Sequence, residues 1–167
     1  MQKTTYPMHS AQRDIYVDQL INKESPLYNI GGYIKLKGNI ELEKFHEAVN
    51  SASEVFDAFK MRFDFDSDEP AIYLDEDYSK AELKDMDFSN NKDPESEALD
   101  WMQNRFNTHF IVKKENPLYE QSLLKISENE YWFFGRYHHL ITDGYGFIVF
   151  VQYFAQKYKA LVSGEEK

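Results

Sequence analysis

The sequence predicts an α/β domain built on a mixed sheet flanked by helices. Several segments repeat apolar residues at the three- and four-residue spacing of an amphipathic helix, and others alternate apolar with polar residues as half-buried strands do. The two kinds of segment interleave along the chain instead of forming separate blocks, which favours the α/β class. With 167 residues, of which 16% are aromatic, the chain is long and apolar enough for one compact core and unlike a disordered segment.

The first third predicts two helices and a strand. Residues 10–20 read as a helix with Ser10 as a possible cap. Its inward candidates are Ala11, Ile15 and Leu20. Residues 33–38 alternate as a strand after a Gly31-Gly32 pair. Residues 41–56 give the clearest helix, because seven apolar residues share one face. They are Leu42, Phe45, Ala48, Val49, Ala52, Val55 and Phe56.

The middle predicts a hairpin followed by an exposed crossing. Residues 59–65 alternate aromatic or aliphatic residues with charged ones, which indicates a half-buried strand. A turn at 67–70 then predicts that residues 71–74 return as its partner. Residues 75–92 are acidic and weakly patterned, so we expect an exposed crossing segment there.

The last part predicts a helix, a strand pair and a second helix. Asp93 and Pro94 are typical of a helix start, and that helix is expected to continue through Leu99, Met102, Phe106 and Phe110. Residues 121–126 form a strand expected to pair with 131–138. The final helix, with an apolar stripe from Phe147 to Leu161, is expected to end near Val162.

The most informative segment is His138-His139-Leu140-Ile141-Thr142-Asp143-Gly144, which reads HHxxxDG. Adjacent strand residues point to opposite faces, so the two histidines have different roles and do not bind one metal together. Thr142 and Asp143 are both suitable N-caps for the helix that follows. The segment thus predicts a strand, a turn and a helix, with a histidine where the strand ends. A buried core histidine and a plain capping aspartate are the alternative interpretations, and we keep the first of these for His138.

Three blocks of the sequence resemble the condensation domains of nonribosomal peptide synthetases. They are Tyr6-Pro7-Met8-His9-Ser10-Ala11-Gln12-Arg13-Asp14-Ile15-Tyr16, Phe56-Asp57-Ala58-Phe59-Lys60-Met61-Arg62-Phe63, and the HHxxxDG segment. The wider group that includes chloramphenicol acetyltransferase shares the last of them. The resemblance implies a chloramphenicol acetyltransferase-like subdomain: residues 1–167 as the N-terminal half of a two-half domain whose C-terminal subdomain is absent. An isolated half of this kind is expected to be inactive.

The resemblance also implies a chemistry. Family members join an acyl or peptidyl thioester to an aminoacyl group, both held on carrier-protein phosphopantetheine arms, so no cofactor is expected on this chain. By position, His139 corresponds to the histidine that orients or deprotonates the attacking amine. His138, Asp143 and Gly144 complete the expected site, with Gly144 allowing close backbone approach. The family pairs its motif aspartate with an arginine, where this chain has Lys60; Arg62, two residues on, is the alternative partner.

The partners that the resemblance implies are donor and acceptor carrier proteins, the missing C-terminal subdomain and adjacent synthetase domains. Three alternatives remain open at this point. An epimerisation domain shares the double histidine, a free-standing acyltransferase using coenzyme A or a carrier shares the fold, and a non-catalytic module would only recruit a carrier.

Composition excludes several other classes. The net charge of −10 and the lack of a basic cluster argue against nucleic acid and anionic membranes. With no cysteine, neither a thiolate metal site nor a cysteine nucleophile is possible. No signal-like start or membrane-length apolar run is present, so a cytoplasmic protein is expected. His9, His46 and His109 match no motif and are assigned no role.

Overall fold

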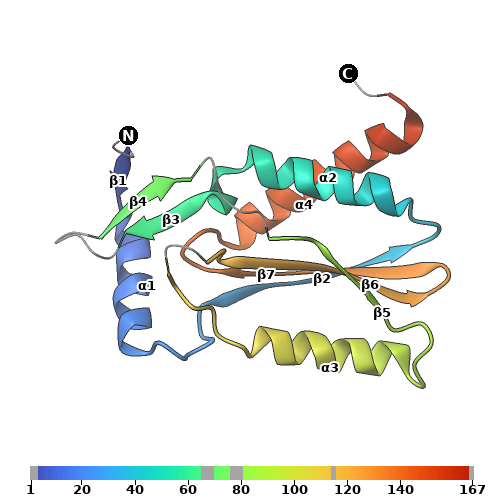
Figure 1. The fold of residues 1–167 in the computed structure, drawn as a ribbon, viewed down its shortest axis with the longest axis horizontal. Helices are drawn as coiled ribbons and strands as arrows, with labels where there is room; N and C mark the ends of the chain where they lie inside the picture. Colours follow the sequence, from blue (N-terminus) through green and yellow to red (C-terminus); the bar gives the residue numbers. More distant parts are fainter. Residues whose placement is uncertain (1–3, 65–69, 76–80, 114–115, 166–167) are drawn as a thin grey trace.

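A computed structural model of the protein describes residues 4–64, 70–75, 81–113 and 116–165. Helices and strands alternate along this part of the chain, as expected (Figure 1). The elements are β1 Thr5–Pro7, α1 Ser10–Ile21, β2 Asn29–Lys37, α2 Leu42–Val55, a 3₁₀ helix Asp57–Phe59, β3 Met61–Asp64, β4 Ala71–Leu74, β5 Lys84–Asp87, α3 Pro94–Phe106, β6 Tyr119–Ser127, β7 Glu130–His138 and α4 Gly144–Ser163. Among the described residues, no helix is long and apolar enough to cross a membrane.

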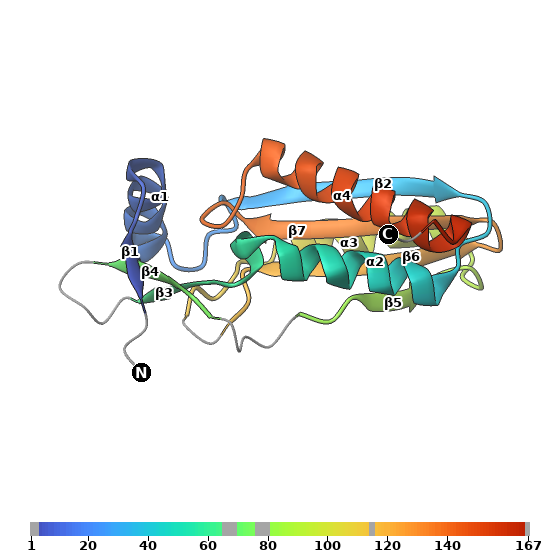
Figure 2. The ribbon, with the colours of Figure 1, turned by 90° about the horizontal axis from the view of Figure 1, so that it is seen from above.

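The main sheet has four strands in the order β2-β7-β6-β5. The β6–β7 hairpin and the β2–β7 pair are antiparallel, whereas β5 runs parallel to β6, so the sheet is mixed as predicted. Helices α2 and α4 cover one face of this sheet and α3 covers the other (Figures 1 and 2). The fold therefore has three layers, with β7 in an interior position between β2 and β6.

The two faces of β7 contribute to two separate cores, because successive side chains of a strand alternate. Phe133 and Tyr137 pack in the larger core with residues of α2 and α4, including Phe45 and Phe150. Trp132 and Phe134 pack on the α3 side with Ala98 and Met102, among others. This alternation confirms that neighbouring residues at the end of β7 lie on opposite faces.

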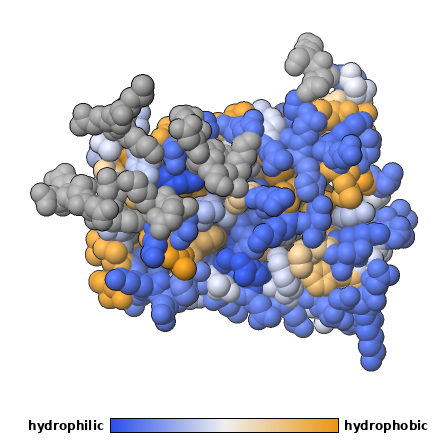
Figure 3. Space-filling model, viewed as in Figure 1, coloured by the Kyte–Doolittle hydropathy of each residue, from blue (hydrophilic) through white to orange (hydrophobic). Residues whose placement is uncertain are grey.

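A smaller sheet and α1 lie beside one end of the main sheet (Figures 1 and 2). The smaller sheet has the order β1-β4-β3, and its β3–β4 pair is the predicted hairpin. Two buried side chains of α1 are Tyr16 and Gln19. Figure 3 shows a largely hydrophilic face on which hydrophobic atoms gather at the α1 end. Exposed apolar residues of α1 are Val17, Leu20 and Ile21.

Both predicted aspartate caps are present. Asp93 Oδ1 accepts a hydrogen bond from the Ser96 N–H at 3.2 Å and begins α3, with Pro94 in the first turn. Asp143 Oδ1 accepts one from the Gly146 N–H at 2.8 Å and begins α4. Each cap provides a partner for an amide that the first helical turn leaves unpaired.

One prediction that the structure corrects is the exposed crossing at 75–92, of which residues 76–80 lie outside the described part. Lys84–Asp87 form β5, an edge strand of the main sheet. The pattern was missed because Lys84, Asp85 and Asp87 are exposed, while the buried anchors Leu83 and Phe88 lie just outside the strand. Charged residues are typical of an edge strand, where they oppose pairing with another chain.

Other corrections concern element ends and helix faces. Phe59 belongs to the 3₁₀ helix before β3, and Phe65 lies outside the described residues. Helix α3 ends at Phe106, so Phe110 is buried in the following loop. The predicted inward residues Ala11 and Leu20 of α1 are exposed, because α1 lies beside one end of the main sheet and not across its face (Figure 2).

Candidate functional site

The HHxxxDG segment forms the expected strand, turn and helix. Strand β7 ends at His138 and α4 begins at Gly144. The His139 N–H donates to the Tyr28 carbonyl at 2.8 Å, and the Ile141 N–H donates to the His138 carbonyl at 3.0 Å. These main-chain bonds hold the turn against the segment before β2, so the two histidine side chains project from a constrained backbone.

His138 is buried, with 1% of its surface exposed, and both ring nitrogens have partners. Its Nδ1 accepts a hydrogen bond from the Leu140 N–H at 3.1 Å. Its Nε2 lies 3.1 Å from Gln19 Oε1 and must carry the proton, because Nδ1 acts as an acceptor. Burial, with a smaller contribution from His139, lowers the pKa of His138 to about 4. His138 is thus a neutral, enclosed residue, consistent with a core role.

His139 differs in both exposure and bonding. Its ring is half-buried, and its Nδ1 lies 3.0 Å from the Thr142 carbonyl oxygen. A carbonyl can only accept, so in the neutral ring Nδ1 carries the proton and the lone pair lies on Nε2. Within the described chain, Nε2 has no hydrogen-bond partner. His139 therefore presents an available base to its surroundings.

An open pocket surrounds His139 where residues of all three sequence blocks meet. Helix α1 contributes Ala11, Gln12 and Ile15 to its lining, and Ala58 comes from the 3₁₀ helix. The turn and the start of α4 complete it with Leu140, Ile141, Thr142, Asp143 and Gly146. Three segments that are distant in the sequence thus converge on one histidine.

Asp143 and Gly144 lie at the exposed start of α4. A side-chain carbon added at Gly144 would meet nothing within 4 Å, so the backbone there is open to approach from outside the chain. At Gly146 the same carbon would lie 2.3 Å from Thr142 Oγ1. Of these two glycines, Gly146, which the sequence did not single out, is the one whose replacement would force a neighbouring side chain to shift.

The pairing of Asp143 with Lys60 or Arg62 stays a prediction. Lys60 Nζ lies 3.8 Å from Asp57 Oδ1, and Arg62 donates to the Phe59 and Met61 carbonyls. Lys60 lies at the end of the 3₁₀ helix, before β3, whereas Arg62 lies within β3. Asp143 caps α4.

A second, almost wholly apolar pocket adjoins the His139 pocket. The two share Ala58, Ile141, Thr142 and Gly146 in their walls. The remaining lining is mainly aromatic and comes from the end of α2, the 3₁₀ helix, β7 and α4: Phe56, Phe59, Tyr137, Tyr145, Phe147, Val149 and Phe150. An apolar group could therefore be accommodated beside the site.

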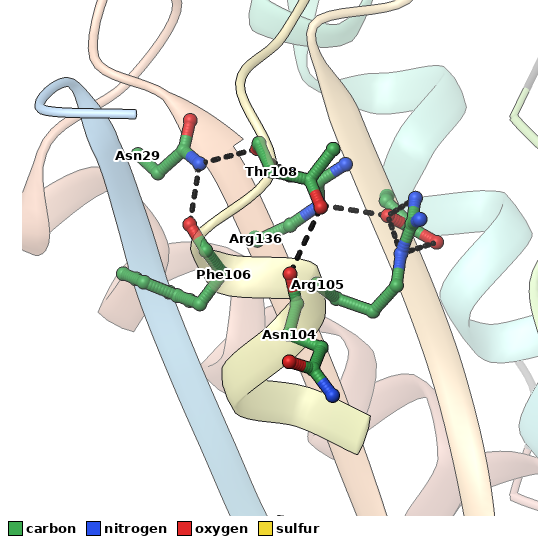
Figure 4. A network of polar contacts seen from close by, with 7 residues as sticks. Asn29, Asn104, Arg105, Phe106, Thr108 and Arg136 are labelled. Atoms are coloured by element: carbon green, nitrogen blue, oxygen red, sulfur yellow. Dashed lines mark hydrogen bonds and ion pairs between the residues drawn. The ribbon is translucent and has the colours of Figure 1, made fainter. Parts of the chain in front are cut away.

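A charge network missed by the sequence analysis includes Arg136 (Figure 4). Arg136 lies two residues before His138 and therefore on the same face of β7. Arg105 Nη2 and Arg136 Nε both donate to Glu120 Oε2 at 2.7 Å. Arg136, 4% exposed, also donates to the Thr108 carbonyl and lies 4.3 Å over the Phe110 ring. Burial lowers the pKa of Arg136. Burial acts to raise the pKa of Glu120, but hydrogen bonds from both arginines outweigh it, so that pKa is lowered.

This network anchors the loop after α3. Asn29 Nδ2 donates to the Phe106 and Thr108 carbonyls at 2.6 and 2.8 Å, so β2 holds the same loop from the other side (Figure 4). The only early signal was a charged residue, Arg136, within an aromatic strand. Among the described residues, no cluster of three or more histidine or acidic side chains could hold a metal ion.

Comparison with known proteins assigns the family. The condensation-domain family profile matches residues 2–167. A plipastatin synthase of Bacillus subtilis is 32% identical over 145 residues, which cover 86% of this chain and 6% of that protein. Enterobactin synthase component F of Escherichia coli O157:H7 is 26% identical over 160 residues, covering 96% of this chain and 12% of that protein.

A solved structure shares the fold. The starter condensation domain of rhizomide synthetase RzmA superposes with a TM-score of 0.90 at 28% identity, covering 96% of this chain and 39% of that one. The chain thus spans well under half of this structural relative and a small part of the synthetases. The resemblance stated from the three sequence blocks is confirmed: this chain belongs to the condensation-domain family.

Proposed function

We propose that this chain contributes the histidine-bearing half of a site that forms amide bonds in nonribosomal peptide synthesis. The observation that carries the proposal is the state of His139. Its Nδ1–H is directed to the Thr142 carbonyl, which leaves a lone pair on Nε2 inside an open pocket. A neutral imidazole with one free nitrogen suits a group that orients or deprotonates an amine.

The reaction places an amine beside a thioester carbonyl. The amine nitrogen bonds to the carbonyl carbon, the carbon–sulfur bond breaks, and the thiol leaves with a proton. His139 Nε2 would accept or orient an N–H of the attacking amine. The open backbone at Gly144 and the N-terminus of α4 would face the developing oxyanion. Holding both reactants in one enclosed site supplies further acceleration.

The rest of the site would come from outside this chain. We propose that residues 1–167 form the N-terminal subdomain, since they cover 39% of the RzmA domain structure. A C-terminal subdomain would then supply the opposite wall, and adjacent synthetase domains would follow. Donor and acceptor carrier proteins would deliver their phosphopantetheine arms to the space in front of His139. Without the second wall, the chain alone is expected to be inactive.

The apolar pocket supports a donor whose acyl group is apolar. It shares four lining residues with the His139 pocket, so a thioester held at His139 would have aromatic and aliphatic walls next to its acyl side. A mutant of the RzmA starter domain has been solved in complex with C8-CoA. A medium-chain acyl group is the donor class to assay first on this chain's carrier.

The decisive test uses the full-length protein that contains this chain, with intact mass spectrometry of the acceptor carrier. The unaltered protein is expected to transfer the donor's acyl mass to the aminoacyl carrier, and His139→Ala is expected to lose that transfer. His46→Ala is the matched control, because His46 lies on α2, far from the motif in sequence, and bonds Asp85 at the surface. A His139→Ala variant that transfers at the unaltered rate would overturn the assignment.

The same assay separates the alternative activities. An epimerisation domain would invert a carrier-bound residue without a gain in mass, which chiral analysis of the released acid detects. A free-standing acyltransferase would acylate a small free amine or alcohol in place of the carrier-bound one. A recruitment module would bind the carrier and transfer nothing.

A further inference from the structure

Gln19 is a buried polar residue on α1 that belongs to none of the expected site residues. Its side chain is 5% exposed, and its Oε1 lies 3.1 Å from His138 Nε2 across 119 residues of sequence. It is the contact through which α1 reaches the end of β7. Burial of an amide side chain is costly unless its polar atoms are paired, so each of its contacts bears on its role.

The orientation of the Gln19 amide follows from its other partners. Its Nε2 donates to the Asn22 carbonyl at 2.8 Å and lies 3.5 Å from the Ser25 carbonyl. Carbonyl oxygens cannot donate, so the NH₂ group must face them, and Oε1 must face His138. The last turn of α1 and the segment after it therefore fix an acceptor against the histidine ring.

This acceptor and one main-chain donor determine the state of His138. The Leu140 N–H occupies Nδ1 and Gln19 Oε1 occupies Nε2, so one tautomer satisfies both contacts. Tyr28 and Phe110 flank the ring, with centroids 6.1 and 6.2 Å away. The ring is thereby held both by hydrogen bonds at its two nitrogens and by packing.

His139 lies directly between the two residues that this arrangement holds. His138 precedes it and is bonded to Gln19, while Leu140 follows it and bonds both to the His138 ring and, through its carbonyl, to Gln12 Nε2 at 2.8 Å. Two glutamines of α1 thus bond to the residues on either side of His139, Gln19 to the His138 ring and Gln12 to the Leu140 carbonyl. A shift of His138 would move the backbone that carries the His139 ring.

We infer that Gln19 is a positioning residue: by bonding His138 Nε2–H, it sets the tautomer of His138 and holds His139 in place for the reaction. The inference rests on the proposed function for its kinetic consequence, but not for the contact itself. The competing interpretation is that Gln19 only completes the end of α1, in which case its loss would lower stability without acting through His138.

The first measurement follows the imidazole nitrogens of the 167-residue chain by ¹⁵N NMR. In the unaltered chain, His138 is expected to show a protonated Nε2 and an unprotonated Nδ1. Gln19→Met, of similar length but with no acceptor oxygen, is expected to give a mixture of both tautomers. Gln19→Glu in its protonated form keeps a carbonyl oxygen toward His138 and an O–H toward the Asn22 carbonyl, and is expected to restore the Nε2–H form. An unchanged His138 spectrum in a folded Gln19→Met chain would overturn the inference.

The second measurement is a double-mutant cycle on amide formation in the full-length protein. Gln19→Met is expected to lower kcat by about tenfold while leaving the KM for the acceptor within roughly twofold, because misplacement affects the transition state more than binding. In a His138→Phe background, the same change is expected to have little further effect, since coupled residues are not additive. Additive losses in the two backgrounds would contradict action through His138.

Gln152→Met, at an exposed position of α4, is the matched control and is expected to leave the rate and the His138 spectrum unchanged. If the unaltered full-length protein forms no amide, the proposed function fails. The NMR comparison would still decide whether Gln19 sets the state of His138.

Discussion

The end of β7 and the nearby charge network differ in how fully their polar side chains are paired. The difference arises although His138 and Arg136 are only two residues apart on one face of the strand. In the network, each charged side chain has a charged or carbonyl partner: Arg105 and Arg136 meet Glu120, and Arg136 also meets the Thr108 carbonyl. At the strand end, His138 is fully paired, but the adjacent His139 keeps one ring nitrogen open to a pocket.

The contrast is between side chains whose polar atoms are paired within the fold and a histidine that keeps one ring nitrogen available. A buried ionic network with matched partners limits the freedom of the chain around it, here the loop after α3. A half-buried imidazole with one nitrogen bonded and one available is oriented but still able to exchange a proton. Polar residues close together in the sequence therefore differ in whether all their polar atoms have hydrogen-bond partners within the described chain.

The largest expected effect is on catalysis. His139→Ala should lower the rate of amide formation by about 10²- to 10⁴-fold, the usual range for a lost general base. Its free energy of unfolding should change little, because the ring is only half-buried. Rate and urea unfolding are measured on the same preparation of the full-length protein. If His139→Ala greatly lowered the free energy of unfolding and left the rate unchanged, His139 would behave like the residues of the network, and the contrast would be wrong.

The network should show the reverse pattern. Glu120→Gln removes the carboxylate that both arginines share and leaves the buried Arg136 without a charged partner. We expect the free energy of unfolding to fall by about 3 kcal/mol, because an uncompensated buried charge is strongly destabilising. Urea unfolding monitored by tryptophan fluorescence measures it. A change below ~1 kcal/mol would indicate that solvent already reaches the network.

The pH dependence of stability sharpens the role of His138. The folded pKa of about 4 lies below the ordinary value of 6.5, so the unfolded chain binds a proton that the folded chain excludes. Stability is therefore complete above pH 6.5 and should fall as the pH drops from 6.5 toward 4, by about 3 kcal/mol in total. His138→Phe should flatten this part of the unfolding profile. An equally steep profile in that variant would assign the effect to other groups.

The smallest expected effect is at the surface. Glu95→Gln removes the exposed partner of Lys35, which lies 3.3 Å away. Exposed ion pairs contribute little, so we expect a change of at most about 0.5 kcal/mol. Urea unfolding under the conditions used for Glu120→Gln measures how much the free energy of unfolding changes when a solvated carboxylate is lost. A loss comparable to that of Glu120→Gln would mean that burial does not decide the difference.

Local patterns predicted the elements that alternate cleanly or carry clear caps. The β6–β7 hairpin, the β3–β4 hairpin, α2 and the Asp93 and Asp143 caps are all present because neighbouring residues alone specify them. Strand β5 was not predicted, because its charged side chains face solvent and the buried residues Leu83 and Phe88 lie just beyond its two ends. Lys60 and Arg62 belong to different elements, because the 3₁₀ helix ends at Lys60 and β3 begins at Met61.

By itself, the sequence determined the α/β class, the family and the segment that carries the candidate site, because each of these depends on residue type and spacing within short stretches. Only the tertiary structure decided the rest. It brought Gln19 to His138, joined Arg105, Glu120 and Arg136, and left one nitrogen of His139 open. Which polar atoms find partners depends on contacts between distant segments, and local spacing does not encode them.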